Sequence, residues 1–191
     1  MIAIRRARPE DAAGIAAVHV AAWRATYAGI LPYQYLAGLD ARRIAAGYMR
    51  DLMARRDGHA IFVATVAGVD RLAVGEADVG PQIIGFCSGG RARRHGVAEG
   101  EIETLYLLED WQERGIGRRL LRAMAAHLAA IGCRSAMLWV LAENPTRFFY
   151  GHLHGRIVAT DQVSVAGETK EQRAVLWDPI GLLLEATAST S

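Results

Sequence analysis

Apolar residues recur along the chain with two periods, and these periods predict where helices and strands form. After Pro9, the residues Ile15, Val18, Ala22 and Trp23 are spaced as on one buried face of a helix. Proline is favoured in the first turn of a helix, so this helix is expected to begin there. Three further helices are expected over residues 41–56, 115–131 and 144–153.

Short runs rich in β-branched and apolar residues predict the strands. The expected ranges are 2–7, 59–66, 82–88, 101–108, 135–141, 156–165 and 172–177. The run at 135–141 is apolar on both faces, which is typical of a central parallel strand that is covered on both sides. Strand 101–108, helix 115–131 and this run form a strand–helix–strand unit, which implies a right-handed crossover between two parallel strands. The expected class is therefore α/β with a mixed sheet.

Length and charge limit the functions that the chain can have. Its 191 residues fit one domain, and 22 basic against 20 acidic residues leave a net charge of +2. Such a balance does not favour nucleic acid as a partner. No apolar run approaches the roughly 18–20 residues of a membrane span, and the first residues lack the pattern of a signal peptide. Cys87 and Cys133 lie in apolar segments and are expected to be reduced, so a cytoplasmic protein is predicted.

Glycines and arginines cluster where strand 101–108 gives way to helix 115–131. The first turn of a helix has unpaired N–H groups and a positive dipole end, which together attract anions. Gly115 and Gly117 would let a phosphate approach that backbone, and Arg114 and Arg118 would add charge. Neither a P-loop nor a Rossmann fingerprint is present, since the latter needs glycine where the chain has Leu120. Taken alone, the two glycines are equally typical of a tight strand-to-helix turn.

The order of motifs around these glycines resembles the GNAT superfamily of N-acetyltransferases. Gln-x-x-Gly-x-Gly at 112–117 follows an acidic and apolar strand, as in the acyl-CoA-binding segment of that family. Ile-Ile-Gly-Phe at 83–86 precedes it, and Leu-Trp-Val-Leu at 138–141 follows it, with Asn144 and the pair Phe149-Tyr150 after that. The resemblance assigns residues 2–178 to one GNAT domain and 179–191 to a C-terminal tail.

This resemblance implies a mixed, mostly antiparallel central sheet with a splayed parallel strand pair and flanking helices. It also implies acetyl-CoA as cosubstrate, with pantetheine along the strand and beside an asparagine, and pyrophosphate at the glycine turn. The cofactor-binding residues it implies are Leu105, Leu107, Gln112, Arg114, Gly115, Ile116, Gly117, Arg118 and Asn144. No metal is expected, because His152 and His154 lack a third partner.

Two glutamates are candidates for the catalytic base that takes a proton from the amine. Side chains alternate along a strand, so Glu101 and Glu103 are expected on one face, about 6–7 Å apart, together with Leu105 and Leu107. Either can be the base, directly or through water, and both can also be ordinary charges at the start of a strand. Tyr150 is the candidate acid for the leaving thiolate, although its spacing from the asparagine is one residue shorter than is common in the family. The alternative for Tyr150 is a packed aromatic residue.

The function expected is transfer of acetyl from acetyl-CoA to an amine of a small molecule or peptide by direct attack. Trp23, Tyr27 and Tyr33 lie in a broken helical region that tends to form a wall of the acceptor site in this fold, or they pack in the core. Two alternatives remain open. One is acetylation of a protein N-terminus or lysine, and the other is a non-catalytic acyl-CoA sensor. A homodimer is expected by analogy with the family.

Overall fold

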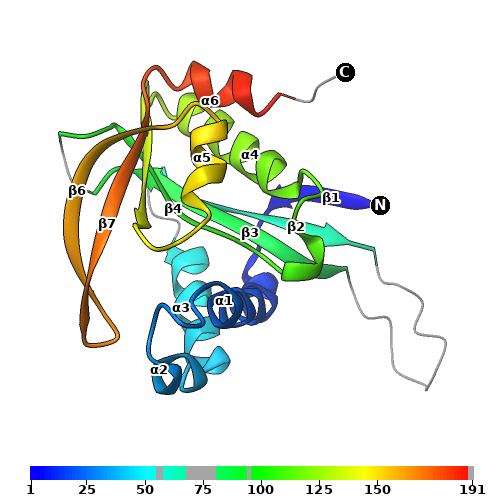
Figure 1. The fold of residues 1–191 in the computed structure, drawn as a ribbon. Helices are drawn as coiled ribbons and strands as arrows, with labels where there is room; N and C mark the ends of the chain where they lie inside the picture. Colours follow the sequence, from blue (N-terminus) through cyan, green and yellow to red (C-terminus); the bar gives the residue numbers. More distant parts are fainter. Residues whose placement is uncertain (55–57, 68–80, 94–95, 189–191) are drawn as a thin grey trace.

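The computed structural model describes residues 1–54, 58–67, 81–93 and 96–188, and seven strands with flanking helices build it (Figure 1). In chain order the elements are β1 (Ile2–Arg6), the 3-10 helix η1 (Pro9–Asp11), α1 (Ala12–Thr26), α2 (Tyr33–Ala37), α3 (Ala41–Ala54), β2 (Ala60–Val66), β3 (Gln82–Arg91), β4 (Gly100–Leu107), the 3-10 helix η2 (Glu109–Trp111), α4 (Ile116–Ala130), β5 (Ala136–Leu141), α5 (Arg147–His152), β6 (Arg156–Val165), β7 (Glu168–Trp177) and α6 (Gly181–Ala186). The irregular insertion expected at 68–81 lies almost wholly outside the described residues.

All seven strands belong to one sheet, in the order β1-β2-β3-β4-β5-β7-β6. Five of the six neighbouring pairs are antiparallel, and β4 with β5 is parallel. The crossover that joins this parallel pair contains α4, as the strand–helix–strand pattern predicts. The predicted class, a mixed and mostly antiparallel sheet with flanking helices, is therefore confirmed.

Helices cover both faces of the sheet, and each face has its own core (Figure 1). On one face α1 packs Ile15 and Val18 against Val63 and Phe86 of the strands. On the other face α4 contributes a larger cluster, in which Leu120 is fully buried. This arrangement follows from the sequence, because each of these helices has one apolar stripe. Both cysteines are buried and free.

The parallel pair separates soon after it forms. Between β4 and β5 only Gly100 with Ala136 and Glu101 with Met137 are in register. Beyond these residues the strands diverge, and this gap is the splayed pair that the family resemblance implies.

One prediction about β4 is wrong, and a β-bulge explains why. Leu105 and Leu107 pack against the α4 cluster, whereas the neighbouring Tyr106 packs against the α1 cluster. Ser88 of β3 is opposite Thr104 but Gly89 is opposite Ile102, so Glu103 is an extra residue in β4. An extra residue inverts the alternation of side chains beyond it. The two leucines therefore do not share a face with the glutamates.

Helix α6 and the residue that follows it contribute to the core. Helix α6 buries Leu183 within the cluster around α4, and the hydroxyl of Thr187 donates to the Leu183 carbonyl at 2.6 Å. Helix α5 begins later than expected, at Arg147, because the Asn144 carboxamide oxygen instead accepts the N–H of Thr146 at 2.9 Å in a turn.

Candidate active site

The gap between β4 and β5 presents backbone groups of β4 that have no strand partner on that side. Leu108 donates its N–H to Ile84 of β3. Because successive N–H groups alternate along a strand, those of Leu105 and Leu107 point to the opposite edge, where β5 has moved away. An extended ligand that lies in this gap can pair with them as a further strand would.

The turn before α4 has the backbone shape of an anion site. Gly115 precedes the helix with a φ of +73°, a left-handed conformation that favours glycine. Gly117 lies in the first turn, where an added Cβ would meet Phe149 no closer than 3.8 Å. Packing within the protein therefore does not require glycine at 117. The absence of a side chain leaves the N–H groups of this first turn accessible, as phosphate binding needs.

The polar side chains expected at this turn lie around it. Gln112 donates from its side-chain amide to the Leu107 carbonyl at 3.4 Å, which links the turn to the gap. The Arg114 guanidinium is exposed and stacks on the Trp111 ring, 5.2 Å from its centroid. Arg118 is half-buried in the first turn of α4, and Ile116 beside it is buried in the core. Ile116 can therefore offer a ligand its backbone N–H and not its side chain.

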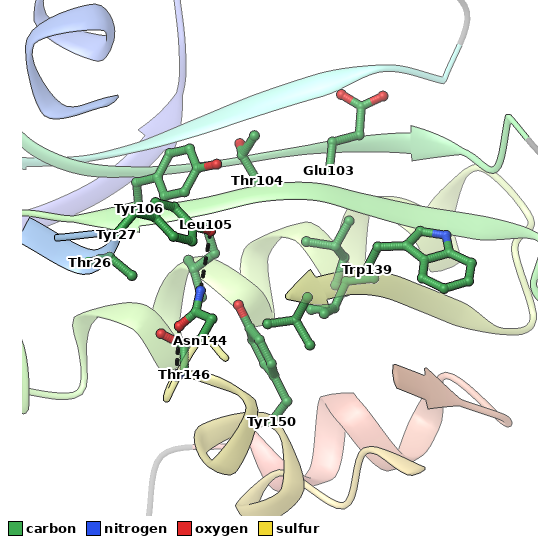
Figure 2. Close-up of a pocket in the computed structure, with 13 residues that line it drawn as sticks. Thr26, Tyr27, Glu103, Thr104, Leu105, Tyr106, Trp139, Asn144, Thr146 and Tyr150 are labelled. Atoms are coloured by element: carbon green, nitrogen blue, oxygen red, sulfur yellow. Dashed lines mark hydrogen bonds between the residues drawn. The ribbon is translucent and has the colours of Figure 1, made fainter. Parts of the chain in front are cut away.

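Asn144 and Tyr27 close the gap at one end, as Figure 2 shows. Both are buried, and the Asn144 amide donates to the Tyr27 hydroxyl at 3.3 Å. Burial raises the pKa of the Tyr27 hydroxyl, while the hydrogen bond from Asn144 acts in the opposite direction. Tyr27 at the end of α1 thus lines the same pocket as Asn144, whereas Tyr33 is 83% exposed.

Tyr150 lies on α5 and its hydroxyl points at β4 (Figure 2). The ring packs against Trp177, with centroids 6.2 Å apart, and is 6% exposed. Burial raises the pKa of the hydroxyl above its ordinary value, so this group stays protonated near neutral pH. Tyr150 is thus a packed aromatic residue whose protonated hydroxyl faces the gap.

The two glutamates of β4 have different surroundings. Both share a face, as predicted, and both contact the guanidinium of Arg93. The Glu101 carboxylate receives that guanidinium at 3.1 Å and also accepts the backbone N–H of Arg93 at 3.3 Å. Glu103 is 3.6 Å from Arg93 Nε and 3.1 Å from Nε2 of His59. Glu101 is therefore held mainly by Arg93, and Glu103 lies between Arg93 and His59.

Three cavities meet at Glu103. A narrow one of about 70 Å³ runs through the gap to Tyr150 and Asn144 and is here named the gap cavity. A second of about 350 Å³, the α3 cavity, is bordered by Tyr48 and His59. A third of about 480 Å³, the β5 cavity, is bordered by both glutamates and residues of β5 and β6. The Glu103 carboxylate lies on the side of β4 opposite Tyr150 and points away from that residue (Figure 2).

Sequence patterns alone do not identify several residues of this site. His59 and Arg93 lie far from the motif at 112–117, and only the strand register brings them to Glu103. His19 of α1 is 2.8 Å from the Tyr48 hydroxyl through Nδ1, and burial lowers its pKa to about 4. His19 and Trp23 are four residues apart, so a helix places them side by side, and their ring centroids lie 5.3 Å apart. This spacing is the sequence feature that could have identified His19.

Comparison with known sequences determines the family. Residues 47–155 match the acetyltransferase (GNAT) family. This chain belongs to the GNAT family. It is 32% identical over 185 residues to the uncharacterized N-acetyltransferase YuaI of Bacillus subtilis, covering 96% of each protein. It is also 32% identical over 163 residues to the probable N-acetyltransferase Rv2775 of Mycobacterium tuberculosis, covering 81% of this chain and 82% of the relative.

Solved structures confirm the GNAT fold. The PaiA N-acetyltransferase of Thermoplasma acidophilum, in complex with coenzyme A, superposes with a TM-score of 0.64 at 19% identity, over 91% of this chain and 98% of that one. YncA of Salmonella typhimurium, a putative acetyltransferase with acetyl-CoA, gives 0.62 at 18% identity, over 100% and 98%. The family match and the named relatives confirm the predicted enzyme class, an acetyl-CoA-dependent N-acetyltransferase.

Two further observations concern the described part of the chain. No helix there is long and apolar enough to span a membrane. Within the same residues, no three side chains of His, Cys, Asp or Glu gather as a metal site requires.

Proposed function

We propose that this GNAT protein transfers acetyl from acetyl-CoA to the amine of a small molecule, with Glu103 as base and Tyr150 as acid. The observation that carries this proposal is the meeting of three cavities at Glu103, one of which leads through the strand gap to Tyr150. The acceptor then approaches from the side of α3 and the thioester from the side of α5. The two substrates meet in the gap.

Acetyl-CoA fits the residues that line the gap and the glycine turn. The N–H groups at Leu105 and Leu107 suit the amides of pantetheine, and Asn144 lies at the same gap. The first turn of α4 suits the pyrophosphate, with Gly115, Ile116 and Gly117 offering backbone N–H groups and Gln112, Arg114 and Arg118 beside them. Acetyl-CoA supplies an activated acyl group. The PaiA structure with coenzyme A and the YncA structure with acetyl-CoA share this fold.

The chemistry requires a base because an amine with an ordinary pKa of about 10 is protonated at neutral pH. Glu103 takes that proton, directly or through a water molecule, and the neutral amine attacks. Backbone N–H groups of β4 are positioned to stabilise the negative charge that develops on the carbonyl oxygen. Tyr150 then donates its hydroxyl proton to the departing sulfur, and the second proton that the amine nitrogen loses as the amide forms restores the tyrosine hydroxyl.

Glu103 is preferred to Glu101 for a geometric reason. Glu103 borders the gap cavity, whereas Glu101 borders only the β5 cavity among those three. The size of the cavities favours a small acceptor over a folded protein, because about 350 and 480 Å³ fall in the range of small-molecule sites. Acetylation of a protein N-terminus or lysine is the weaker alternative, and a cytoplasmic homodimer remains a prediction.

The test is the release of free CoA from acetyl-CoA across a panel of amines, amino acids, aminoglycosides and short peptides. Glu103→Gln and Glu101→Gln form a matched pair, because each removes one charge from the same face of β4. We expect turnover with one class of amine and a fall in kcat of about 10²-fold or more for Glu103→Gln only. An equal fall in kcat in both variants would contradict the assignment of Glu103 as the base. No turnover by wild-type protein that acetyl-CoA nevertheless stabilises thermally would favour a sensor.

A further inference from the structure

His59 is held in a fixed position beside Glu103. It directly precedes β2, and its side chain is 12% exposed. Arg6 donates to its backbone carbonyl at 3.1 Å, and His127 Nε2 lies 3.0 Å from the carbonyl of the preceding Gly58. These contacts hold the backbone of His59 from both sides. The fixed backbone of His59 therefore keeps Nε2 within 3.1 Å of the Glu103 carboxylate.

His59 borders two cavities. On one side it borders the α3 cavity together with Glu103. On the other it borders a larger space of about 630 Å³, here named the outer cavity, which Arg6, Pro9 and Leu52 also line. Ile61 also borders both cavities. A proton that reaches His59 from Glu103 thus has a second way out, away from the acceptor.

Every turnover leaves a proton on the base, and the base must lose it before the next amine is deprotonated. Arg93 is permanently charged and cannot take this proton. Tyr48 holds its own proton, because burial raises the pKa of its hydroxyl. His19 resists protonation, because burial lowers its pKa to about 4.

The carboxylates of Glu101 and Asp51 border the neighbouring cavities, and Arg6 borders the outer cavity. Arg93 already binds the Glu101 carboxylate at 3.1 Å. Asp51 borders both the α3 cavity and the outer cavity, so it lies along the path of the proton from Glu103 to the outer cavity. It is not the first group that receives the proton from Glu103. Of the described groups, His59 combines hydrogen-bond distance to Glu103 with a ring nitrogen that can accept and release a proton.

We propose that His59 carries the proton from Glu103 to the outer cavity and so regenerates the base. This role rests on the proposed function of Glu103. The ammonium of the acceptor loses a proton to the Glu103 carboxylate, and the resulting carboxylic acid passes it to Nε2 of His59 in the tautomer that carries its proton on Nδ1. The carboxylate is restored and an imidazolium forms, which then loses one proton to water in the outer cavity. No electrons are exchanged.

The test compares His59→Gln with wild type. Glutamine keeps an N–H donor that can hold Glu103 in place, but it cannot relay a proton at neutral pH. We expect kcat to fall at least tenfold with the KM for acetyl-CoA within twofold, and kcat to recover as the concentration of imidazole buffer rises. His152→Gln, the same change at an exposed histidine of α5, should match wild type at every buffer concentration. Unchanged kcat in His59→Gln, or a loss that buffer does not reverse, would overturn the relay.

A second measurement does not depend on turnover or on the stability of the histidine variant. In protein labelled with ¹⁵N in the histidine rings, the His59 resonances should move on Glu103→Gln and stay in place on Glu101→Gln. His59 resonances that stay in place on Glu103→Gln would also overturn the proposal. If wild-type protein acetylates no amine, the proposed function fails. The labelled protein still shows whether the His59 ring responds to the charge of Glu103.

Discussion

The side-chain amide of Asn144 donates a hydrogen bond to the hydroxyl of Tyr27, 3.3 Å away, and so joins the end of α1 to the turn before α5. Both side chains are buried, at 7% and 9% exposure. The amide oxygen of Asn144 accepts the N–H of Thr146 at 2.9 Å. These two bonds orient the amide at the mouth of the strand gap.

A double-mutant cycle of Tyr27→Phe and Asn144→Ala should measure this contact. A buried hydrogen bond of this kind contributes about 0.5–1.5 kcal/mol to the free energy of unfolding, so the coupling should fall in that range. Asn144→Ala alone should cost more than Tyr27→Phe, because the N–H of Thr146 also loses its acceptor. Urea unfolding of the four proteins provides the values. A coupling near zero would show that the contact has no energetic role.

Gly117→Ala should separate stability from cofactor binding. The nearest described atom to an added Cβ is 3.8 Å away, so the fold accommodates alanine, and helix propensity favours it by up to about 1 kcal/mol. The new methyl group would meet the pyrophosphate, so we expect a raised melting temperature and at least a tenfold higher KM for acetyl-CoA.

Gly115→Ala is the matched control for that change. Its φ of +73° makes alanine strained by about 1–2 kcal/mol, so its melting temperature should fall. An unchanged KM in Gly117→Ala would place the pyrophosphate elsewhere.

Tyr150→Phe should reduce catalysis with little effect on folding. The ring keeps its packing against Trp177, so the free energy of unfolding should change by less than about 1 kcal/mol. The loss of the proton donor should lower kcat about 10²-fold, with the KM for acetyl-CoA little changed. Steady-state kinetics and urea unfolding of the same preparations test this. Wild-type kcat in Tyr150→Phe would assign the tyrosine to packing alone.

The stability of the protein should fall in acid partly through His19. Its pKa in the folded protein is about 4, below the ordinary 6.5, because folding favours the neutral imidazole over the charged one. The contribution is complete above pH 6.5 and is lost as the pH falls toward 4. A shift of this size corresponds to about 1–3 kcal/mol after allowance for partial exposure. Urea unfolding between pH 7 and pH 4 should show a shallower loss in His19→Gln than in wild type, and equal slopes would exclude this role.

Much of the site follows from local sequence patterns, but its partners do not. The glycine turn, the helix after it and the two candidate glutamates are all recognisable within residues 101–131, because each depends on neighbours in the chain. His59 reaches Glu103 only because β2, β3 and β4 pair in one register. Local spacing carries no information about that pairing.

The sequence by itself determined the alternation of strands and helices, the glycine turn before α4 and the family to which the chain belongs. Periodicity and backbone preference act over a few residues, so they can be read along the chain. Only the tertiary structure decided that Glu103 is the extra residue of a β-bulge, that Leu105 and Leu107 face α4, and that α6 buries Leu183. Those outcomes depend on how distant strands and helices pack, and packing is a property of the whole fold.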